Sequence, residues 1–298
     1  MNSRVTRYRR LRHSAVVLAA AVVVAGGLAT VDASASPRTP SRAKQFQSSP
    51  RMVNANGHKL AFYVTPGRLP AIVLDAGGGN DASYWENIVP VLAKETGREI
   101  ITYDRSGEGR SPYVPGPWKA PKAASDLAAG LRQLKADKNV TLVSHSLAGE
   151  IATYYVKDHP RSTAGAVLVD ANLPQFFTRS ETAKLVAANQ AQIDALKGQP
   201  ITPEIRQLLA EAANYGPVHN TYHKQSWPRT VPVTAIVSSE TPFPTPDDAQ
   251  LWRTAQQQFV DAGPHRNLVV ADPSSHDVPL DRPEIVVKAV EDMVNQGR

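Results

Sequence analysis

Cysteine is absent from the 298-residue sequence. Its absence excludes disulfide bonds, a thiol nucleophile and thiolate metal sites. The chain also has little excess of one charge once its first 35 residues are set apart. The whole chain has 33 Lys+Arg against 27 Asp+Glu, and residues 1–35 hold five arginines and one aspartate, which leaves 28 against 26. This balance does not predict nucleic acid as a partner.

A phosphate-binding loop is missing as well. The glycine run Gly77–Gly79 is not followed by Gly-Lys-Ser/Thr, and the G-x-G-x-x-G spacing is absent. His219 and His223 are four residues apart, but two imidazoles without a third ligand do not predict a metal site. We therefore expect no cofactor and no metal.

The first 35 residues have the three-part pattern of a secretory signal. An arginine-rich start precedes the apolar run Ser14–Ala29, and residues 33–35 (ASA) have the form of a cleavage site. An uncleaved membrane anchor is the alternative, although the run is short for a bilayer span of about 20 residues. We expect cleavage after Ala35, secretion and no stable membrane partner. Residues 36–51, rich in Pro, Ser and basic residues, are expected to form a disordered leader.

Strand-like and helix-like patterns alternate through residues 52–298. Asn56-Gly57, between two short runs, predicts a hairpin. Continuous apolar runs follow at residues 71–75, 99–104, 140–144, 164–170, 231–238 and 267–272, separated by segments with helical spacing. This pattern predicts an α/β fold with a mostly parallel sheet covered by helices on both faces.

One long segment interrupts the alternation. Residues 173–229 are helical or irregular in pattern and contain no convincing strand. An insertion of this length between two sheet strands predicts a helical cap above the strand ends, while ordinary covering helices are the alternative.

The segment VTLVSHSLAGEIATYY, residues 140–155, places Ser146 at a corner between an apolar strand and a helix. A sharp turn at such a corner exposes the central side chain at the start of the helix. Small residues are needed on both sides because strand and helix approach closely. Ser144 and Ala148 stand there in place of glycine, so this pattern alone is a weak signal.

Four segments in the same order resemble the α/β-hydrolase fold family over residues 52–298. They are IVLDAGGGNDASYW (72–85), ITYDRSGEGRSP (101–112), VSHSLAGE (143–150) and SSHDVPLDRPEIVVKAV (274–290). The second is the most specific match. The resemblance implies an α/β-hydrolase fold with a helical cap, in which Ser146 is the nucleophile and His276 is the base that later acts as acid.

The acid that orients the histidine should lie between Ser146 and His276 in the chain. Asp170 closes the apolar run 164–170, and Glu240 follows the run 231–238. We prefer Asp170 because it lies directly at a strand end, whereas Glu240 enters a proline-rich loop. Asp247 is a third option.

The resemblance also implies two oxyanion donors, the backbone amides of Leu147 and Gly78. Asp104 and Arg105 are expected to be structural. The side chain of His145 is expected to point away from the site.

Together these features predict a secreted, cofactor-independent serine hydrolase that acts on small-molecule carboxylic esters. A peptidase or amidase, a peroxidase-like activity on the same residues, and a non-catalytic secreted binding protein are the alternatives. Aromatic residues of the cap segment either line an apolar substrate pocket or pack the cap on the sheet: Phe176, Phe177, Tyr215, Tyr222 and Trp227.

Overall fold

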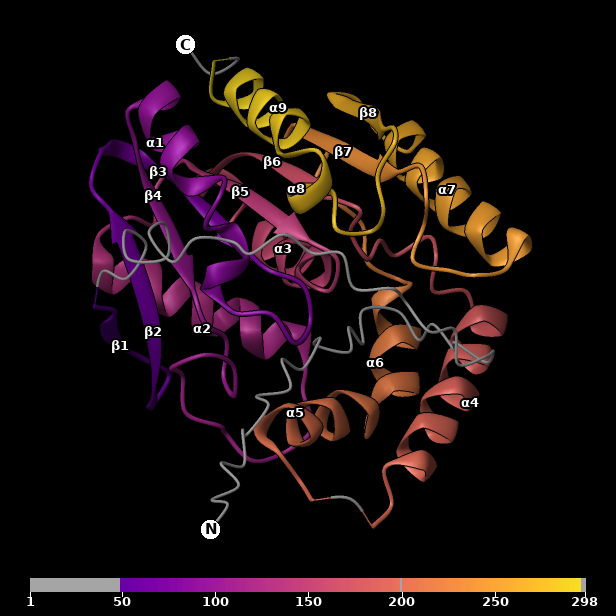
Figure 1. Cartoon of the computed structure of the whole chain (residues 1–298). Coiled ribbons are helices and arrows are strands. Elements are labelled where there is room, and N and C mark those ends of the chain that lie inside the picture. Colours follow the sequence, from indigo (N-terminus) through magenta and orange to yellow (C-terminus); the bar gives the residue numbers. More distant parts are fainter. Residues whose placement is uncertain (1–48, 199, 296–298) are drawn as a thin grey trace, which may run out of the picture.

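The computed structural model describes residues 49–198 and 200–295 (Figure 1). The predicted signal, residues 1–35, and residues 36–48 of the predicted leader lie outside these ranges. Arg51, the last residue assigned to the leader, already begins the first strand.

A sheet of eight strands forms the centre of the described chain (Figure 1). In chain order they are β1 (Arg51–Ala55), β2 (His58–Thr65), β3 (Arg68–Asp75), β4 (Arg98–Tyr103), β5 (Val140–His145), β6 (Thr163–Val169), β7 (Val233–Ser238) and β8 (Arg266–Ala271). Their order in the sheet is β1-β2-β4-β3-β5-β6-β7-β8. Strands β3 to β8 pair in parallel, so their carboxyl ends lie at one edge.

The hairpin predicted at Asn56-Gly57 joins β1 and β2, which pair antiparallel. Both turn residues have positive φ, 52° and 92°. This is the conformation that Asn-Gly adopts readily in a two-residue hairpin loop. Strand β2 then pairs antiparallel with β4 and connects the hairpin to the parallel strands.

Helices cover both faces of the sheet (Figure 1). Helices α1 (Val89–Thr96) and α9 (Pro283–Asn295) pack on one face, while α2 (Ala120–Leu134), α3 (Ala148–Asp158) and α7 (Pro246–Asp261) pack on the other. Successive side chains of β3 point to opposite faces of the sheet and so contribute to the hydrophobic core on each face. Ile72 and Leu74 belong to the core beneath α1 and α9, and Val73 belongs to the core beneath α2, α3 and α7. The predicted fold class is confirmed.

Three further helices lie between β6 and β7, in the segment predicted to form the cap. They are α4 (Arg179–Ala195), α5 (Pro203–Ala212) and α6 (Tyr215–Tyr222), which gather beyond one end of the sheet (Figure 1). The described residues of this segment hold no strand. Within the described ranges, no helix has the length and apolar character needed to cross a bilayer.

Candidate active site

Ser146 stands at the corner between β5 and α3 and has a left-handed backbone, with φ 54°. Three backbone hydrogen bonds hold this conformation: the Ser146 N–H donates to Val169 O at 3.1 Å, and Ser146 O accepts from Gly149 N and Asn172 N, each at 2.9 Å. A non-glycine residue adopts such a φ only when its surroundings enforce it. The corner therefore projects one serine side chain at the carboxyl edge of the sheet.

The close approach of α3 to the segment after β6 places a steric demand on Gly149. A Cβ on Gly149 would lie 2.6 Å from Asn172 O and 2.8 Å from the Ala171 Cβ. Ser144 and Ala148 are accommodated in full burial, with 2% and 0% of their surface exposed. The missing glycines at 144 and 148 therefore do not prevent the turn.

A chain of hydrogen bonds runs from Ser146 through His276 to Asp170. The Ser146 Oγ lies 2.9 Å from His276 Nε2, and His276 Nδ1 lies 2.7 Å from Asp170 Oδ2. The three residues come from the ends of β5, β6 and the loop after β8, which share one sheet edge. Glu240 and Asp247 are exposed, and the acid that contacts His276 is Asp170.

Three further donors fix the Asp170 carboxylate. Ser238 donates from its N–H at 3.1 Å and its Oγ at 2.7 Å, and Trp252 Nε1 donates at 2.8 Å. Burial alone would raise the pKa of Asp170, but the hydrogen bonds from His276, Trp252 and Ser238 hold that pKa below its ordinary value. The carboxylate therefore stays ionised beside His276.

The turn after β3 lies against Ser146. A Cβ on Gly77 would be 2.9 Å from His145 Nδ1 and 3.1 Å from the Ser146 Cβ, so only glycine fits there. Arg105 Nη2 donates to Gly77 O at 2.6 Å. In a trans peptide the next N–H, that of Gly78, points opposite to that carbonyl and away from Arg105. Within the described chain, the Gly78 and Leu147 amides have no hydrogen-bond partner.

His145 does not point away from the site, contrary to the expectation from sequence. Its ring centroid is 4.7 Å from that of His276 and 5.0 Å from that of Tyr84, on which it stacks. Its Nε2 lies 2.9 Å from His276 O, a contact that a neutral ring with the proton on Nε2 satisfies. Burial, followed by repulsion from His276, lowers the pKa of His145 to about 3, so the ring stays neutral.

A small cavity adjoins the residue after Ser146; we call it the Glu211 cavity. Its wall consists of Trp118, Leu147, Asn172, Glu211, Ala212, Tyr215, Val218 and His219. Of the five aromatic residues predicted for a pocket, Tyr215 lines it, and the other four are buried in the core. Ser146 itself has no exposed surface.

The family model described as "Alpha/beta hydrolase family" matches residues 72–289, more than half of the chain. The chain belongs to the α/β hydrolase family.

Relatives of this α/β hydrolase are similar over parts of their length. A protein of Variovorax paradoxus (strain S110) named "Putative carbamate hydrolase RutD" is 34% identical over 104 residues, 34% of this chain and 38% of the relative. A proline iminopeptidase of Levilactobacillus brevis is 36% identical over 102 residues, 33% of each protein. The chain therefore matches little more than a third of the length of these curated relatives.

Solved structures share the fold at low identity. The esterase EaEST from Exiguobacterium antarcticum has a TM-score of 0.61 and 19% identity, covering 83% of this chain and 99% of the esterase. The epoxide hydrolase CorEH has a TM-score of 0.59 and 16% identity, covering 84% and 99%. At such identities the likeness shows the fold alone.

In this α/β hydrolase the turn after β4 builds a buried ionic cluster. Arg105 contacts Asp75, Ala76 O and Glu108, the last at 2.9 Å, and all three side chains are buried. Glu108 Oε1 also accepts from Gly79 N at 3.2 Å. The cluster therefore fixes the 76–79 turn through hydrogen bonds from Arg105 and to Glu108. Burial raises the pKa of Glu108 to about 8, although the Arg105 charge opposes the shift.

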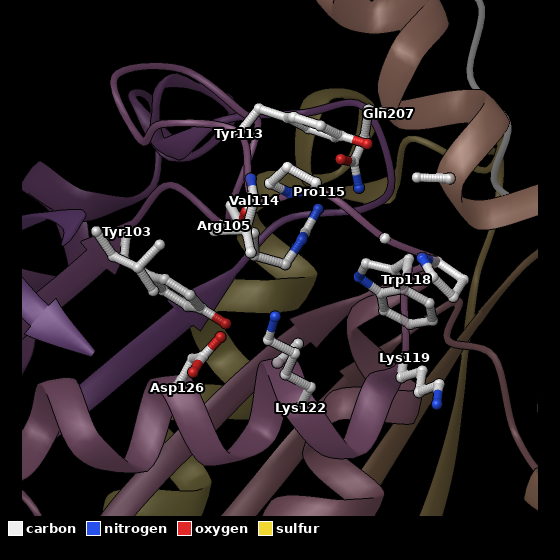
Figure 2. Close-up of a pocket in the computed structure, with 16 residues that line it drawn as sticks. Tyr103, Arg105, Tyr113, Val114, Pro115, Trp118, Lys119, Lys122, Asp126 and Gln207 are labelled. Carbon is white, nitrogen blue, oxygen red and sulfur yellow. Dashed lines mark hydrogen bonds between the residues drawn. The ribbon is translucent and has the colours of Figure 1, made fainter. Parts of the chain in front are cut away.

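A second cavity of the α/β hydrolase lies between the loop after β4, α2 and α5. Figure 2 shows Arg105, Tyr113 and Trp118 of the loop around it, with Lys122 of α2 and Gln207 of α5. Ser146, His276 and Asp170 do not line this cavity. Trp118 lines both cavities. Its backbone N–H donates to Ala210 O at 3.0 Å, which connects the loop to α5.

Proposed function

We propose that this α/β hydrolase is a serine hydrolase that cleaves small carboxylic esters through an acyl-enzyme on Ser146. The observation that carries the proposal is the hydrogen-bonded series Ser146–His276–Asp170, with distances of 2.9 and 2.7 Å. Beside it lie the Leu147 and Gly78 amides, which have no hydrogen-bond partner among the described residues. This is the arrangement in which a base activates a serine and an acid orients the base. The chemistry needs no cofactor.

In the first half of the reaction, His276 Nε2 takes the proton from Ser146 Oγ as the oxygen attacks the ester carbonyl. The carbonyl oxygen becomes an oxyanion, which the Leu147 and Gly78 amides stabilise by hydrogen bonds. His276 then gives the proton to the departing alcohol, and the acyl group remains on Ser146.

In the second half, His276 takes a proton from water, which attacks the acyl carbonyl and forms a second oxyanion at the same amides. When this intermediate collapses, the Ser146 Oγ leaves with the proton from His276, and the carboxylic acid is released. Asp170 stays ionised throughout and stabilises the imidazolium of His276. His145 acts on His276 as a positioning residue, through the contact with the His276 carbonyl.

Amide substrates are the second candidate, because the same acyl-enzyme forms when the leaving group is an amine. The partial similarity to a carbamate hydrolase and to a proline iminopeptidase supports this candidate. An alcohol leaves more readily than an amine, so ester cleavage requires less of the site.

Hydrolysis of p-nitrophenyl butyrate tests the proposal. We expect Ser146→Ala to lower kcat by about 10⁴-fold or more. Without the Ser146 Oγ no acyl-enzyme can form, so His276 and Asp170 have no nucleophile to activate. Ser144→Ala is the matched control, a buried serine two residues away on β5. It should retain turnover within a few-fold. Full turnover by Ser146→Ala would contradict the proposal.

We also propose that the enzyme is secreted, with residues 1–35 as its signal. The support is the three-part pattern of the sequence. N-terminal sequencing of the exported protein should begin at Ser36, and an N-terminus at residue 1 would contradict cleavage.

A further inference from the structure

The Glu211 cavity has acidic and amide side chains in its wall, next to the residue that follows the proposed nucleophile. Glu211 comes from α5, His219 and Tyr215 from α6, and Asn172 from the loop after β6. A substrate that reaches Ser146 beside Leu147 also meets this wall. The polar character of the cavity therefore bears on substrate choice.

Buried acceptors in and behind this wall lack partners. Asn172 is 2% exposed, and its Nδ2 donates to Glu150 Oε1 at 2.7 Å. That bond fixes the amide orientation, since a flipped amide would place oxygen against the carboxylate. Among the described residues, Asn172 Oδ1, Glu150 Oε2 and the Tyr215 hydroxyl have no hydrogen-bond partner. A buried acceptor without a donor is costly, so a donor on a ligand would be favoured here.

Negative charge exceeds positive charge around the cavity. Glu150 and Glu211 lie near His219, whose Nε2 is 2.9 Å from Glu150 Oε1. The charge of Arg105 also acts on Glu211, but its guanidinium is already paired with Asp75 and Glu108. Burial raises the pKa of Glu211 to about 7, with the Gln207 hydrogen bond opposing the shift. Among the described residues, Glu211 accepts one hydrogen bond, from Gln207 Nε2 to its Oε1 at 3.0 Å, and forms no ion pair.

Two aromatic residues complete the wall. Trp118 and Tyr215 both line the cavity. Aromatic rings beside a carboxylate favour an organic cation over a carboxylate or phosphate, because the ring faces carry negative potential. A neutral hydroxyl could satisfy the free acceptors, but it would form no ion pair with Glu211.

We propose that the Glu211 cavity binds the protonated amine of the substrate, which makes the enzyme selective for small amino esters. The proposal rests on the proposed function, because it takes the ester carbonyl to lie at the Leu147 amide. Leu147 also lines the cavity, so the amine and the carbonyl belong to one small molecule. The Glu211 carboxylate and Asn172 Oδ1 accept hydrogen bonds from the ammonium.

The test compares butylammonium with 1-butanol, which has the same chain without the charge. Both are assayed as competitive inhibitors of p-nitrophenyl acetate hydrolysis by the wild-type enzyme and by Glu211→Gln. We expect the inhibition constant of butylammonium to rise about tenfold in Glu211→Gln, and that of 1-butanol to change less than twofold. Asp194→Asn, which removes an exposed cap carboxylate on α4, should leave both constants unchanged.

The pH dependence provides a second readout. The ammonium binds the ionised form of Glu211, so its inhibition constant should fall as pH rises through about 7. The groups that face Glu211 are Glu150 on α3, His219 on α6, Arg105 and Glu108 on the loop after β4, and Gln207 on its own helix. In Glu211→Gln the inhibition constant of butylammonium should not fall as pH rises, because glutamine does not titrate.

Thermal unfolding of Ser146→Ala separates this proposal from the proposed function, because it needs no turnover. Butylammonium should raise the unfolding temperature of Ser146→Ala more than 1-butanol does. If the wild-type enzyme hydrolyses esters but both ligands behave alike in every assay, the amine site is wrong and the proposed function stands. If the amine stabilises Ser146→Ala but the wild-type enzyme has no esterase activity, the proposed function is wrong. If Glu211→Gln does not fold, Tyr215→Phe takes its place in the inhibition assay. We expect the inhibition constant of butylammonium to rise two- to fivefold in that variant.

Discussion

Asp170 accepts hydrogen bonds from three donors before His276 is counted: the Ser238 N–H, the Ser238 Oγ and Trp252 Nε1. Its own backbone is left-handed, with φ 40°, a conformation that aspartate tolerates better than most residues. These bonds keep the carboxylate ionised and aimed at His276 Nδ1. In the proposed reaction that contact fixes the tautomer in which Nε2 can accept the Ser146 proton.

Asp170→Asn should therefore lower kcat by about 10⁴-fold, because the amide can stabilise the wrong tautomer of His276 and cannot balance an imidazolium. The measurement is steady-state hydrolysis of p-nitrophenyl butyrate. Glu240→Gln is the matched control, since Glu240 is exposed and the same charge is removed. Loss of activity in Glu240→Gln with retention in Asp170→Asn would assign the acid to Glu240.

Sequence alone could propose Ser146 and His276, because each stands in a local motif at a predicted strand end. It left Asp170 and Glu240 as alternatives, since both follow apolar runs and their distances to His276 depend on tertiary structure. It missed the contact of His145 with His276 and the burial of Glu150 beside His219. Glu150 and His219 are 69 positions apart, and neither stands in a motif that signals the contact.

The 76–79 turn between β3 and the 3-10 helix at Ala82–Trp85 is the element that aims the Gly78 amide. Arg105 and Glu108 bind it on one side, and on the other Gly77 leaves no room for a Cβ beside His145 and Ser146. The turn is thus fixed between a buried ion cluster and the serine corner. A shift of either side would move the proposed oxyanion donor.

Gly77→Ala should lower kcat by about 10²- to 10³-fold, the effect of losing one oxyanion donor, because its Cβ would push the turn away from Ser146. Gly79→Ala is the control in the same turn. Its Cβ would meet nothing within 4 Å, and its cost is the strain of φ 73°, about 1 kcal/mol of stability. Steady-state kinetics and thermal unfolding of both variants separate the two effects. Equal losses of kcat would contradict a steric role for Gly77.

At the scale of the whole molecule, the alternating patterns predicted the parallel strands, the covering helices and the hairpin. The patterns could not predict the order of the strands in the sheet, where β4 lies between β2 and β3. This order depends on how helices distant in the sequence pack on the sheet. The helices between β6 and β7 were predicted by an absence of strand pattern, but their internal arrangement was not. The Glu211 cavity forms only where α5 and α6 meet the end of β6 and the start of α3.

The ionic cluster of Asp75, Arg105 and Glu108 affects the stability of the whole fold. Burial raises the folded-state pKa of Glu108 to about 8, and an unfolded chain titrates glutamate near about 4.3. Between these values the folded state holds a proton that the unfolded state has released. The contribution of Glu108 to stability is therefore present below about pH 4.3 and is lost as pH rises toward 8.

Glu108→Gln should flatten this dependence, because a glutamine keeps the acceptor for Gly79 N and does not titrate. Urea unfolding between pH 5 and pH 8 measures it, with a slope difference of up to about 1.4 kcal/mol per pH unit. Glu95→Gln, an exposed carboxyl on α1, is the control and should keep the wild-type slope. Identical slopes for all three proteins would contradict the raised pKa of Glu108.

The most direct test of the central claim is the position of a covalent adduct. The purified enzyme is treated with a fluorophosphonate and digested, and the modified peptide is sequenced by mass spectrometry. The proposed function predicts a single phosphonyl group on Ser146, no adduct in Ser146→Ala and strongly slowed labelling in His276→Ala. An adduct on another residue, or labelling that persists in Ser146→Ala, would contradict it.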